Sequence, residues 1–251
     1  MTKTTQATLM VVYERLLAAF GPQKWWPAQT RFEVIVGAIL TQNTNWGNVE
    51  KALVNLKRNK LLSPQALKNI LPRKLSSLIR PAGYFNVKTK RLKNFISFFF
   101  NEYDGSLKKM MKEDGTLLRQ KLLAVNGIGP ETADSILLYA LDQPVFVVDA
   151  YTKRILYRHN MIASDADYAT VQEMFMSVLR HDVHMFNEYH ALIVRLGKDF
   201  CRPKPLCDQC VLNDFYYSLT AKCGQCHRVL PRKGGRNSSK KGRLCRECNA
   251  K

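Results

Sequence analysis

A glycine-containing turn between two short amphipathic segments is the feature that most constrains the fold of this chain. Apolar residues at helical spacing predict one helix over 117–125 and a second over 130–141, and residues 126–129 form the turn between them. Gly127 and Gly129 can take a positive φ and let the backbone approach a ligand, while the proline that follows suits the first position of a helix. The outward-facing amides of the second helix, with the positive end of its dipole behind them, suit an anion. An ordinary helical hairpin, with the isoleucine of the turn in the core, is the alternative.

A single carboxylate follows this hairpin. The apolar run 144–148 is strand-like and leads to Asp149, which directly precedes a helix predicted over 150–157. Asp is a favoured N-cap, so a purely structural role is one interpretation. An Asp at a helix N-terminus also stays ionised at neutral pH, and it can stabilise a sugar that becomes an oxocarbenium ion while it orients an attacking water. The two roles can coexist.

The chain is strongly basic. It has 39 Lys and Arg against 20 Asp and Glu, a formal net charge of +19. Such an excess neutralises phosphates and releases counterions, which favours a nucleic acid as the partner, with a DNA phosphate as the candidate anion at the hairpin. The basic runs 88–91 and 233–241 are candidate contacts, although either can be a solvated surface, and ribosome-associated proteins share this charge.

Helical spacing of apolar residues dominates the rest of the chain. The length allows one large or two modest domains, and the 46% hydrophobic content suffices for packed cores. Patterning alone predicts an all-α globule. Further helices are predicted over 8–20, 32–40, 49–56, 88–100, 168–179 and 188–196.

The sequence has no long apolar span, and its first twenty residues lack the features of a secretory signal. We therefore expect a cytoplasmic protein of the bacterial cytosol or nucleoid, with no membrane partner. A monomer is expected.

Five separated segments occur in an order that is typical of one enzyme family. They are Leu-Thr-Gln-Asn-Thr at 40–44, Arg-Pro-Ala-Gly-Tyr-Phe-Asn-Val-Lys at 80–88, the hairpin, Val-Val-Asp at 147–149 and Gly-Lys-Asp-Phe-Cys at 197–201. Together they resemble the helix-hairpin-helix DNA glycosylases of the endonuclease III branch, over most of residues 10–216. The resemblance implies two helical lobes with a DNA cleft between them. One lobe would be discontinuous, from 1–30 and 142–216, and the other would be 31–141.

The resemblance also implies roles for individual residues. Asp149 corresponds to the catalytic aspartate of the family, and Gln42 to a residue that fills the gap left in DNA by an extruded base. The hairpin glycines Gly127 and Gly129 would hold a DNA phosphate, and Lys88 of the basic run would add a DNA contact.

One position departs from the family pattern. Members that also cut the DNA backbone carry a Schiff-base lysine two residues after the second hairpin glycine, where this chain has Glu131. A carboxylate cannot form that imine, so the departure predicts water as the nucleophile and a monofunctional glycosylase. A bifunctional glycosylase and lyase on oxidised pyrimidines, using another lysine such as Lys153 or Lys198, is one alternative. A noncatalytic DNA-binding protein, with Asp149 only a cap, is another.

All three tryptophans lie in two clusters, Trp25-Trp26-Pro27 and Trp46. Flat aromatic faces can sandwich a flipped base, and they favour a cationic base such as N3-methyladenine. The Trp-Trp-Pro element resembles that of the monofunctional 3-methyladenine DNA glycosylases related to endonuclease III. We therefore predict a base pocket at these residues and excision of alkylated, 3-methyladenine-type bases in base excision repair. Packing of Trp25 and Trp26 in the core is the alternative.

All seven cysteines follow residue 200, which in a cytosolic protein points to metal rather than disulfides. Two Cys-x₂-Cys pairs separated by 18 residues, Cys223, Cys226, Cys245 and Cys248, suit tetrahedral Zn²⁺. They predict a small structural zinc ribbon over 217–251, an extension of the helical fold.

The other three cysteines are Cys201, Cys207 and Cys210, and they resemble the iron-sulfur loop of endonuclease III relatives. The fourth cysteine of that loop would fall near position 216, which is Tyr216 here. A three-cysteine loop can hold no [4Fe-4S] cluster, a labile one, or one completed by Cys223. Because the ribbon uses its four cysteines coherently, we predict loss of the cluster rather than retention.

Overall fold

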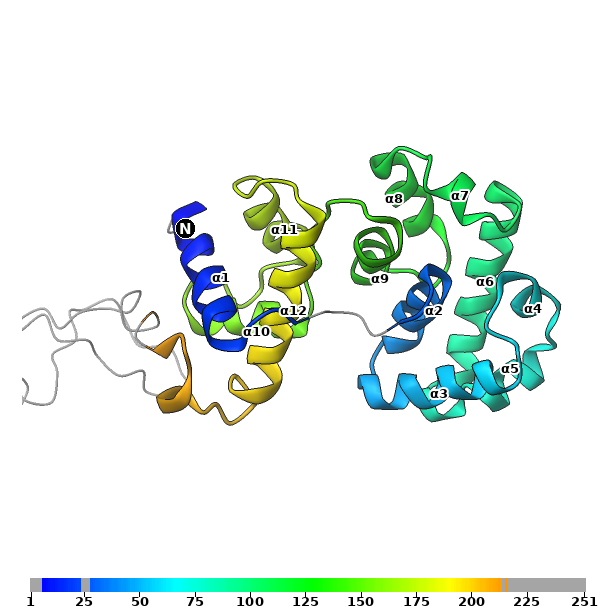
Figure 1. Cartoon of the computed structure of the whole chain (residues 1–251), viewed down its shortest axis with the longest axis horizontal. Coiled ribbons are helices and arrows are strands. Elements are labelled where there is room, and N and C mark those ends of the chain that lie inside the picture. Colours follow the sequence, from blue (N-terminus) through cyan, green and yellow to red (C-terminus); the bar gives the residue numbers. More distant parts are fainter. Residues whose placement is uncertain (1–5, 24–27, 214, 216–251) are drawn as a thin grey trace, which may run out of the picture. The chain divides into compact units, whose positions relative to one another are not determined.

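The computed structural model describes residues 6–23, 28–213 and 215, and over these residues the chain consists of helices and loops without a strand (Figure 1). The prediction of an all-α fold is confirmed for this part of the chain. The predicted zinc ribbon over 217–251 lies outside the described residues. None of the described helices is long and apolar enough to cross a membrane.

The chain folds into two compact units. Of the described residues, unit 1 contains 6–23, 148–179 and those from 189 onward, and unit 2 contains 28–147 and 180–188. Unit 1 is therefore assembled from segments that are far apart in the sequence, whereas unit 2 is almost continuous.

Helix α2 (Arg31–Thr41) is the central helix of unit 2. Every residue from Phe32 to Leu40 is buried, and the helix packs against α3, α6, α9 and η2. A helix that is covered on all sides is expected to be apolar all round. The one buried charge of α2, Glu33, forms an ion pair of 2.7 Å with Lys57. The other helical elements of the unit are α3 (Trp46–Arg58), α4 (Pro64–Asn69), α5 (Pro72–Leu78), η1 (Arg80–Ala82), α6 (Phe85–Tyr103), α7 (Leu107–Met110), α8 (Gly115–Ala124), α9 (Pro130–Ser135) and the π-helix η2 (Ile136–Ala140).

Unit 1 is built around the end of α12 (Val183–Asp199), whose residues from Tyr189 onward belong to it. Tyr189 is buried, and its hydroxyl donates to the carbonyl of Leu9 at 2.8 Å. Its ring meets that of Phe175 edge to face, with 5.6 Å between the centroids. The remaining helices of unit 1 are α1 (Gln6–Phe20), α10 (Ala150–Arg158), α11 (Tyr168–Met176) and η3 (Cys207–Gln209).

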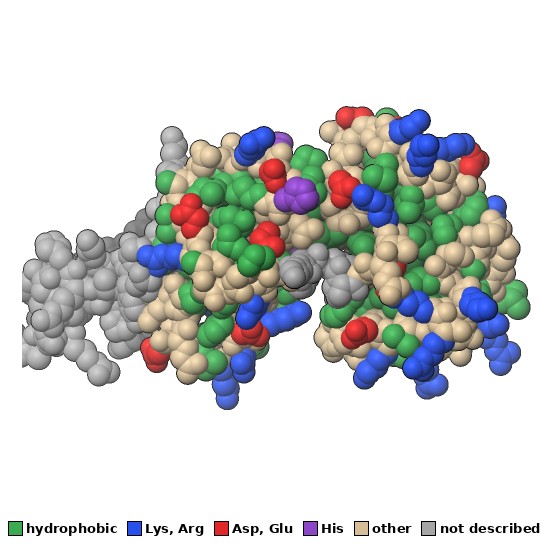
Figure 2. All heavy atoms as spheres, in the orientation of Figure 1, with side chains coloured by type: hydrophobic (Ala, Val, Ile, Leu, Met, Phe, Trp, Pro, Cys, Tyr) green, Lys and Arg blue, Asp and Glu red, His purple; other side chains and the backbone are tan. Residues whose placement is uncertain are grey.

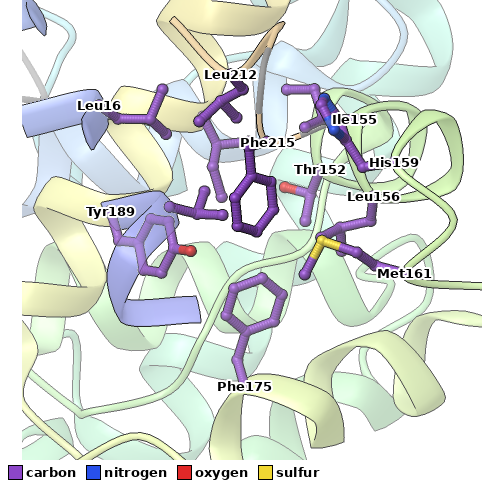
Figure 3. Close-up of a pocket in the computed structure, with 12 residues that line it drawn as sticks. Leu16, Thr152, Ile155, Leu156, His159, Met161, Phe175, Tyr189, Leu212 and Phe215 are labelled. Carbon is purple, nitrogen blue, oxygen red and sulfur yellow. The ribbon is translucent and has the colours of Figure 1, made fainter. Parts of the chain in front are cut away.

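A small apolar cavity lies inside unit 1. Side chains such as Leu16, Ile155, Phe175 and Phe215 surround it (Figure 3). Its volume of about 10 Å³ is on the scale of a single water molecule. It cannot accept a nucleobase, so it is a packing defect of the core and not a base pocket.

The predicted helices all coincide with observed ones, with ends displaced by a few residues. The prediction of a strand-like segment over 144–148 is wrong, because the structure has no strand there. Phe146, Val147 and Val148 are buried, but a strand also requires a neighbouring strand to pair with, and none exists among the described residues. The helix predicted over 130–141 is helical throughout, but it changes from α9 to a π-helix at Ile136.

Candidate active site

The two glycines of the hairpin have different conformations. Gly127 takes a positive φ of 95°, and a Cβ at this position would overlap the side chain of Arg91. Gly129 has an extended backbone, with φ −93° and ψ 176°, and a Cβ there would meet no atom within 4 Å. Only Gly127 therefore uses the conformation available to glycine. The absence of a side chain at Gly129 leaves the surface in front of α9 open.

The N-terminus of α9 is suited to an anion. Gly129 is its N-cap, and no described side chain caps the first turn. The amide groups of a helix's first turn have no partner within the helix, and they bind an anion readily where the surface is open. Glu131 lies in this turn and is exposed.

Gln42 connects the end of α2 to the hairpin. Its Nε2 donates to the hydroxyl of Thr132 at 2.9 Å and to the carbonyl of Gly127 at 3.2 Å. Its Oε1 accepts a hydrogen bond from Arg91 of α6. The structure thus brings Gln42 and the hairpin together within unit 2. Thr132 and Arg91 are partners that sequence reasoning did not single out, although Arg91 ends the basic run.

Lys88, which was predicted to contact DNA, is inside the protein. Only 1% of the residue is exposed, and its Nζ donates to the carbonyl of Ala82 at 2.7 Å. Burial and the nearby charge of Arg91 lower the pKa of Lys88 to about 8. The amine caps the end of η1, and its position does not support the predicted DNA contact.

Trp46 is the first residue of α3, directly after the N-cap Asn45, and it is partly buried. Trp25, Trp26 and Pro27 lie outside the described residues. The structure therefore places one of the two aromatic clusters, in unit 2, and the base pocket stays a prediction.

Asp149 is the N-cap of α10. Its Oδ1 accepts hydrogen bonds from the amide of Thr152 at 2.7 Å and from the hydroxyl of the same residue at 2.9 Å. These bonds fix one carboxylate oxygen at the start of the helix, as the N-cap preference of Asp predicts.

The second oxygen of Asp149 faces a histidine. Nε2 of His190, on α12, lies 3.7 Å from Oδ2, and the two side chains are 7% and 12% exposed. Burial acts to raise the pKa of Asp149, but His190 and the Thr152 donors outweigh it and hold the pKa below its usual value. The carboxylate is therefore ionised at neutral pH. Sequence reasoning missed His190, because a lone His in an amphipathic helix carries no distinctive spacing.

Cys201, Cys207 and Cys210 follow α12 in unit 1. Cys201 is buried and its Sγ lies 3.3 Å from Nη1 of Arg158, whereas Cys207 is exposed. Burial raises the pKa of the Cys210 thiol. No group of three or more His, Cys, Asp or Glu among the described residues is placed to hold a metal ion. Loss of the cluster therefore stays a prediction.

Comparison with known families decides the relationship. Residues 36–181, which include Gln42, the hairpin and Asp149, match the model of the HhH-GPD superfamily base excision DNA repair proteins. The chain belongs to the HhH-GPD superfamily. As a member it is a DNA glycosylase of base excision repair.

Two relatives extend the match along the chain. A candidate DNA repair glycosylase of Methanocaldococcus jannaschii is 52% identical over 209 residues, which are 82% of this chain and 94% of the relative. Endonuclease III of Sulfolobus acidocaldarius is 30% identical over 190 residues, 74% of this chain and 82% of the relative. The resemblance to endonuclease III expected from the motifs is thereby confirmed.

Solved structures of HhH-GPD proteins share the fold. The 3-methyladenine DNA glycosylase MagIII of H. pylori, bound to 1,N6-ethenoadenine, has a TM-score of 0.66 and 28% identity, with 77% of this chain and 96% of MagIII covered. A noncovalent complex of endonuclease III with DNA has a TM-score of 0.71 at 18% identity, over 83% of this chain and 94% of that chain. The second similarity concerns the fold alone.

Proposed function

We propose that this HhH-GPD member is a monofunctional DNA N-glycosylase that removes alkylated, 3-methyladenine-type bases from double-stranded DNA. The observation that carries the proposal is Glu131, an exposed carboxylate in the first turn of α9, at the position where the family resemblance places a Schiff-base lysine. Without an amine there, the enzyme hydrolyses the N-glycosidic bond with water and leaves the abasic strand intact.

Asp149 supplies the charge that this reaction requires. As the bond between base and sugar breaks, its electron pair leaves with the base and positive charge develops on the sugar. The ionised carboxylate stabilises that charge and accepts a proton from the water that attacks the anomeric carbon. The donors from Thr152 and the neighbouring His190 support the proposal, because they keep the carboxylate ionised and fix its orientation.

Lys153, one of the two alternative Schiff-base lysines, offers little support for a lyase. Nζ of Lys153 donates to the carbonyl of Ala166 at 2.9 Å, so its amine is committed to the backbone of unit 1. Formation of an imine would require that bond to break and the amine to lose its proton. Lys198, the second alternative Schiff-base lysine, is exposed near the end of α12.

The choice of base rests on aromatic residues. We assign Trp46, together with Trp25, Trp26 and Pro27, to a pocket that sandwiches a flipped cationic base. Support comes from the similarity to MagIII, which is named a 3-methyladenine DNA glycosylase and holds a modified adenine in its structure. Gly127 and Gly129 would hold a phosphate, and Gln42 would fill the gap left by the base.

The remaining assignments also belong to the proposal. We assign one structural Zn²⁺ to Cys223, Cys226, Cys245 and Cys248, and no [4Fe-4S] cluster to the three-cysteine loop. The enzyme would act as a monomer in the cytosol or nucleoid.

The experiment that tests the function measures free base and strand breaks on one sample of methylated duplex DNA. We expect release of 3-methyladenine, with strand breaks only after alkali. Breaks without alkali would overturn the monofunctional assignment in favour of a glycosylase and lyase. Absence of release, with oxidised pyrimidines excised instead, would overturn the assignment of the lesion.

A further inference from the structure

The positive charge of this protein is concentrated in two segments. Residues 51–101 contain twelve Lys and Arg and no Asp or Glu, and residues 216–251 contain ten Lys and Arg and one Glu. The rest of the chain has 17 Lys and Arg against 19 Asp and Glu. The charge that suggests a nucleic-acid partner is therefore absent from most of the molecule, including the segment around Asp149.

The first segment forms most of α3 and α6, and all of α4, α5 and η1, in unit 2. One exposed acid, Glu50, lies on α3 directly before the segment. These elements pack on one another, since α3 contacts α5 and η1, and α6 contacts α4 and α5. They are neighbours within the unit, so their exposed charges lie in one region of it. Figure 2 shows Lys and Arg side chains gathered over α3 and α5, whereas over α7 and α8 basic and acidic side chains are interspersed.

Three cations of the segment act inside the unit. Lys88 donates to Ala82, Lys93 donates to the carbonyls at the end of α4, and Arg91 bonds to Gln42. They stabilise helix ends and the hairpin, and they do not belong to the surface.

The other nine cations are exposed. One of them, Lys57, forms an ion pair of 2.7 Å with the buried Glu33 of α2. None of the remaining eight forms an ion pair with any residue in the described part of the chain. We call these eight the acid-free surface: Lys51, Arg58, Lys60, Lys68, Arg73, Lys74, Arg80 and Lys90.

A protein surface whose charges all have the same sign destabilises the folded state. Like charges repel, and they act against the compact state unless an oppositely charged partner is present. A solvated protein surface normally intersperses both signs, as happens around α7 and α8, where the exposed Asp104 and Asp114 lie in the adjoining loops. The acid-free surface therefore indicates a polyanion that covers it.

We propose that the acid-free surface of α3, α4, α5, α6 and η1 is a second contact for duplex DNA, separate from the phosphate-binding hairpin and independent of sequence and damage. This proposal depends on the proposed function only because it identifies the polyanion as DNA. The surface provides most of the salt-dependent affinity of unit 2.

The test compares two variants that lose the same charge. The first replaces Lys51, Arg58, Arg73 and Lys74 with Gln, on α3 and α5. The control replaces four exposed cations of unit 2 outside the acid-free surface, Lys108, Lys109, Lys112 and Arg180, with Gln. Binding to a fluorescent undamaged duplex is measured across a range of salt concentrations, and thermal melting verifies that both variants are folded.

Each phosphate contact contributes about 0.9 to the slope of log affinity against log salt. We expect the magnitude of that slope to fall by about 3 to 4 in the first variant and by less than about 1 in the control. Equal losses in the two variants, or no loss in either, would overturn the proposal. Because undamaged DNA is used, the result does not depend on which base is excised. A failure of this proposal can therefore be told apart from a failure of the proposed glycosylase function.

Discussion

Asp149 combines two tasks in one side chain. Oδ1 caps α10 through Thr152, and Oδ2 lies beside His190. The cap fixes the orientation of the Asp149 carboxylate, and His190 favours its ionised form. The group that stabilises α10 is therefore also oriented to interact with the sugar of the damaged nucleotide. A substitution can separate these tasks.

Asp149→Asn retains a good N-cap but removes the negative charge. We expect excision to fall by about 100- to 10,000-fold, the usual loss for a general base, with DNA affinity and melting temperature close to those of the parent protein. Single-turnover base release, a binding isotherm and thermal melting measure the three quantities. Full turnover in the variant would show that Asp149 is not the reacting carboxylate.

His190 is expected to act through Asp149 as a positioning residue. Removing the polar neighbour of a nearly buried carboxylate costs about 1–3 kcal/mol, so His190→Leu should slow single-turnover excision by roughly 10- to 100-fold without weakening DNA binding. His190→Gln restores a donor on a side chain of similar reach, and it should recover part of the rate. A Leu variant as fast as the parent protein would contradict this role.

The residues of the site differ in how well the sequence could predict them. Asp149 and Gly127 sit at positions whose backbone requirements are local, an N-cap and a turn with positive φ, so their neighbours in the sequence point to them. His190 could not be found in this way, since its contact with Asp149 bridges α12 and α10. Lys88 was misjudged because a basic run does not reveal which of its side chains faces the interior.

At the scale of elements, α10 and α12 are held close by a glycine. A Cβ at Gly197 would overlap Cβ and the ring of Tyr151. Arg154 reinforces the contact, because its guanidinium donates to the carbonyl of Gly197 at 2.9 Å and lies over the Tyr151 ring. This spacing belongs to the same unit as Asp149 and His190, so it supports the pair that we assign to catalysis.

Gly197→Ala is expected to lower the free energy of unfolding by about 1–3 kcal/mol, the usual cost of overpacking, despite the better helix propensity of Ala. Denaturant unfolding measures the change. Gly47→Ala on α3 is the matched control, because a Cβ there meets only Oδ1 of Asn45 at an ordinary 3.5 Å, and its stability should not fall. Similar stability of Gly197→Ala and the parent protein would show that Tyr151 moves aside at little cost.

Element type was predictable where periodicity was long. The helical spacing over 88–100 and 188–196 identified α6 and α12, each of which is longer than predicted. The run 144–148 was not predictable in this way, because a short buried apolar segment has the same composition in a strand and in an extended connection between helices. The π-helix after Ser135 likewise leaves no recognisable pattern in the sequence.

At the scale of the whole molecule, the tail after residue 216 combines ten Lys and Arg with four cysteines of zinc-ribbon spacing. We expect one Zn²⁺ per chain in the purified protein, since four thiolates close a tetrahedral site. Elemental analysis measures it, and Cys245→Ser should lower the zinc content, whereas Cys207→Ser should not. A parent protein without bound zinc would contradict the ribbon.

The discontinuity of unit 1 matters while the protein is being synthesised. Leu9 of α1 and its partner Tyr189 are 180 positions apart. At roughly 5–20 residues per second, a ribosome needs about 10 to 40 s to make that stretch. Until α10 and α11 are made, the buried stripe of α1 (Leu9, Val12 and Leu16) has no other helix of unit 1 to cover it, and Tyr189 joins it later still. The nascent chain therefore exposes this apolar stripe during synthesis. Helix α1 is accordingly a site where chaperones can bind, or aggregation can begin, before the chain leaves the ribosome.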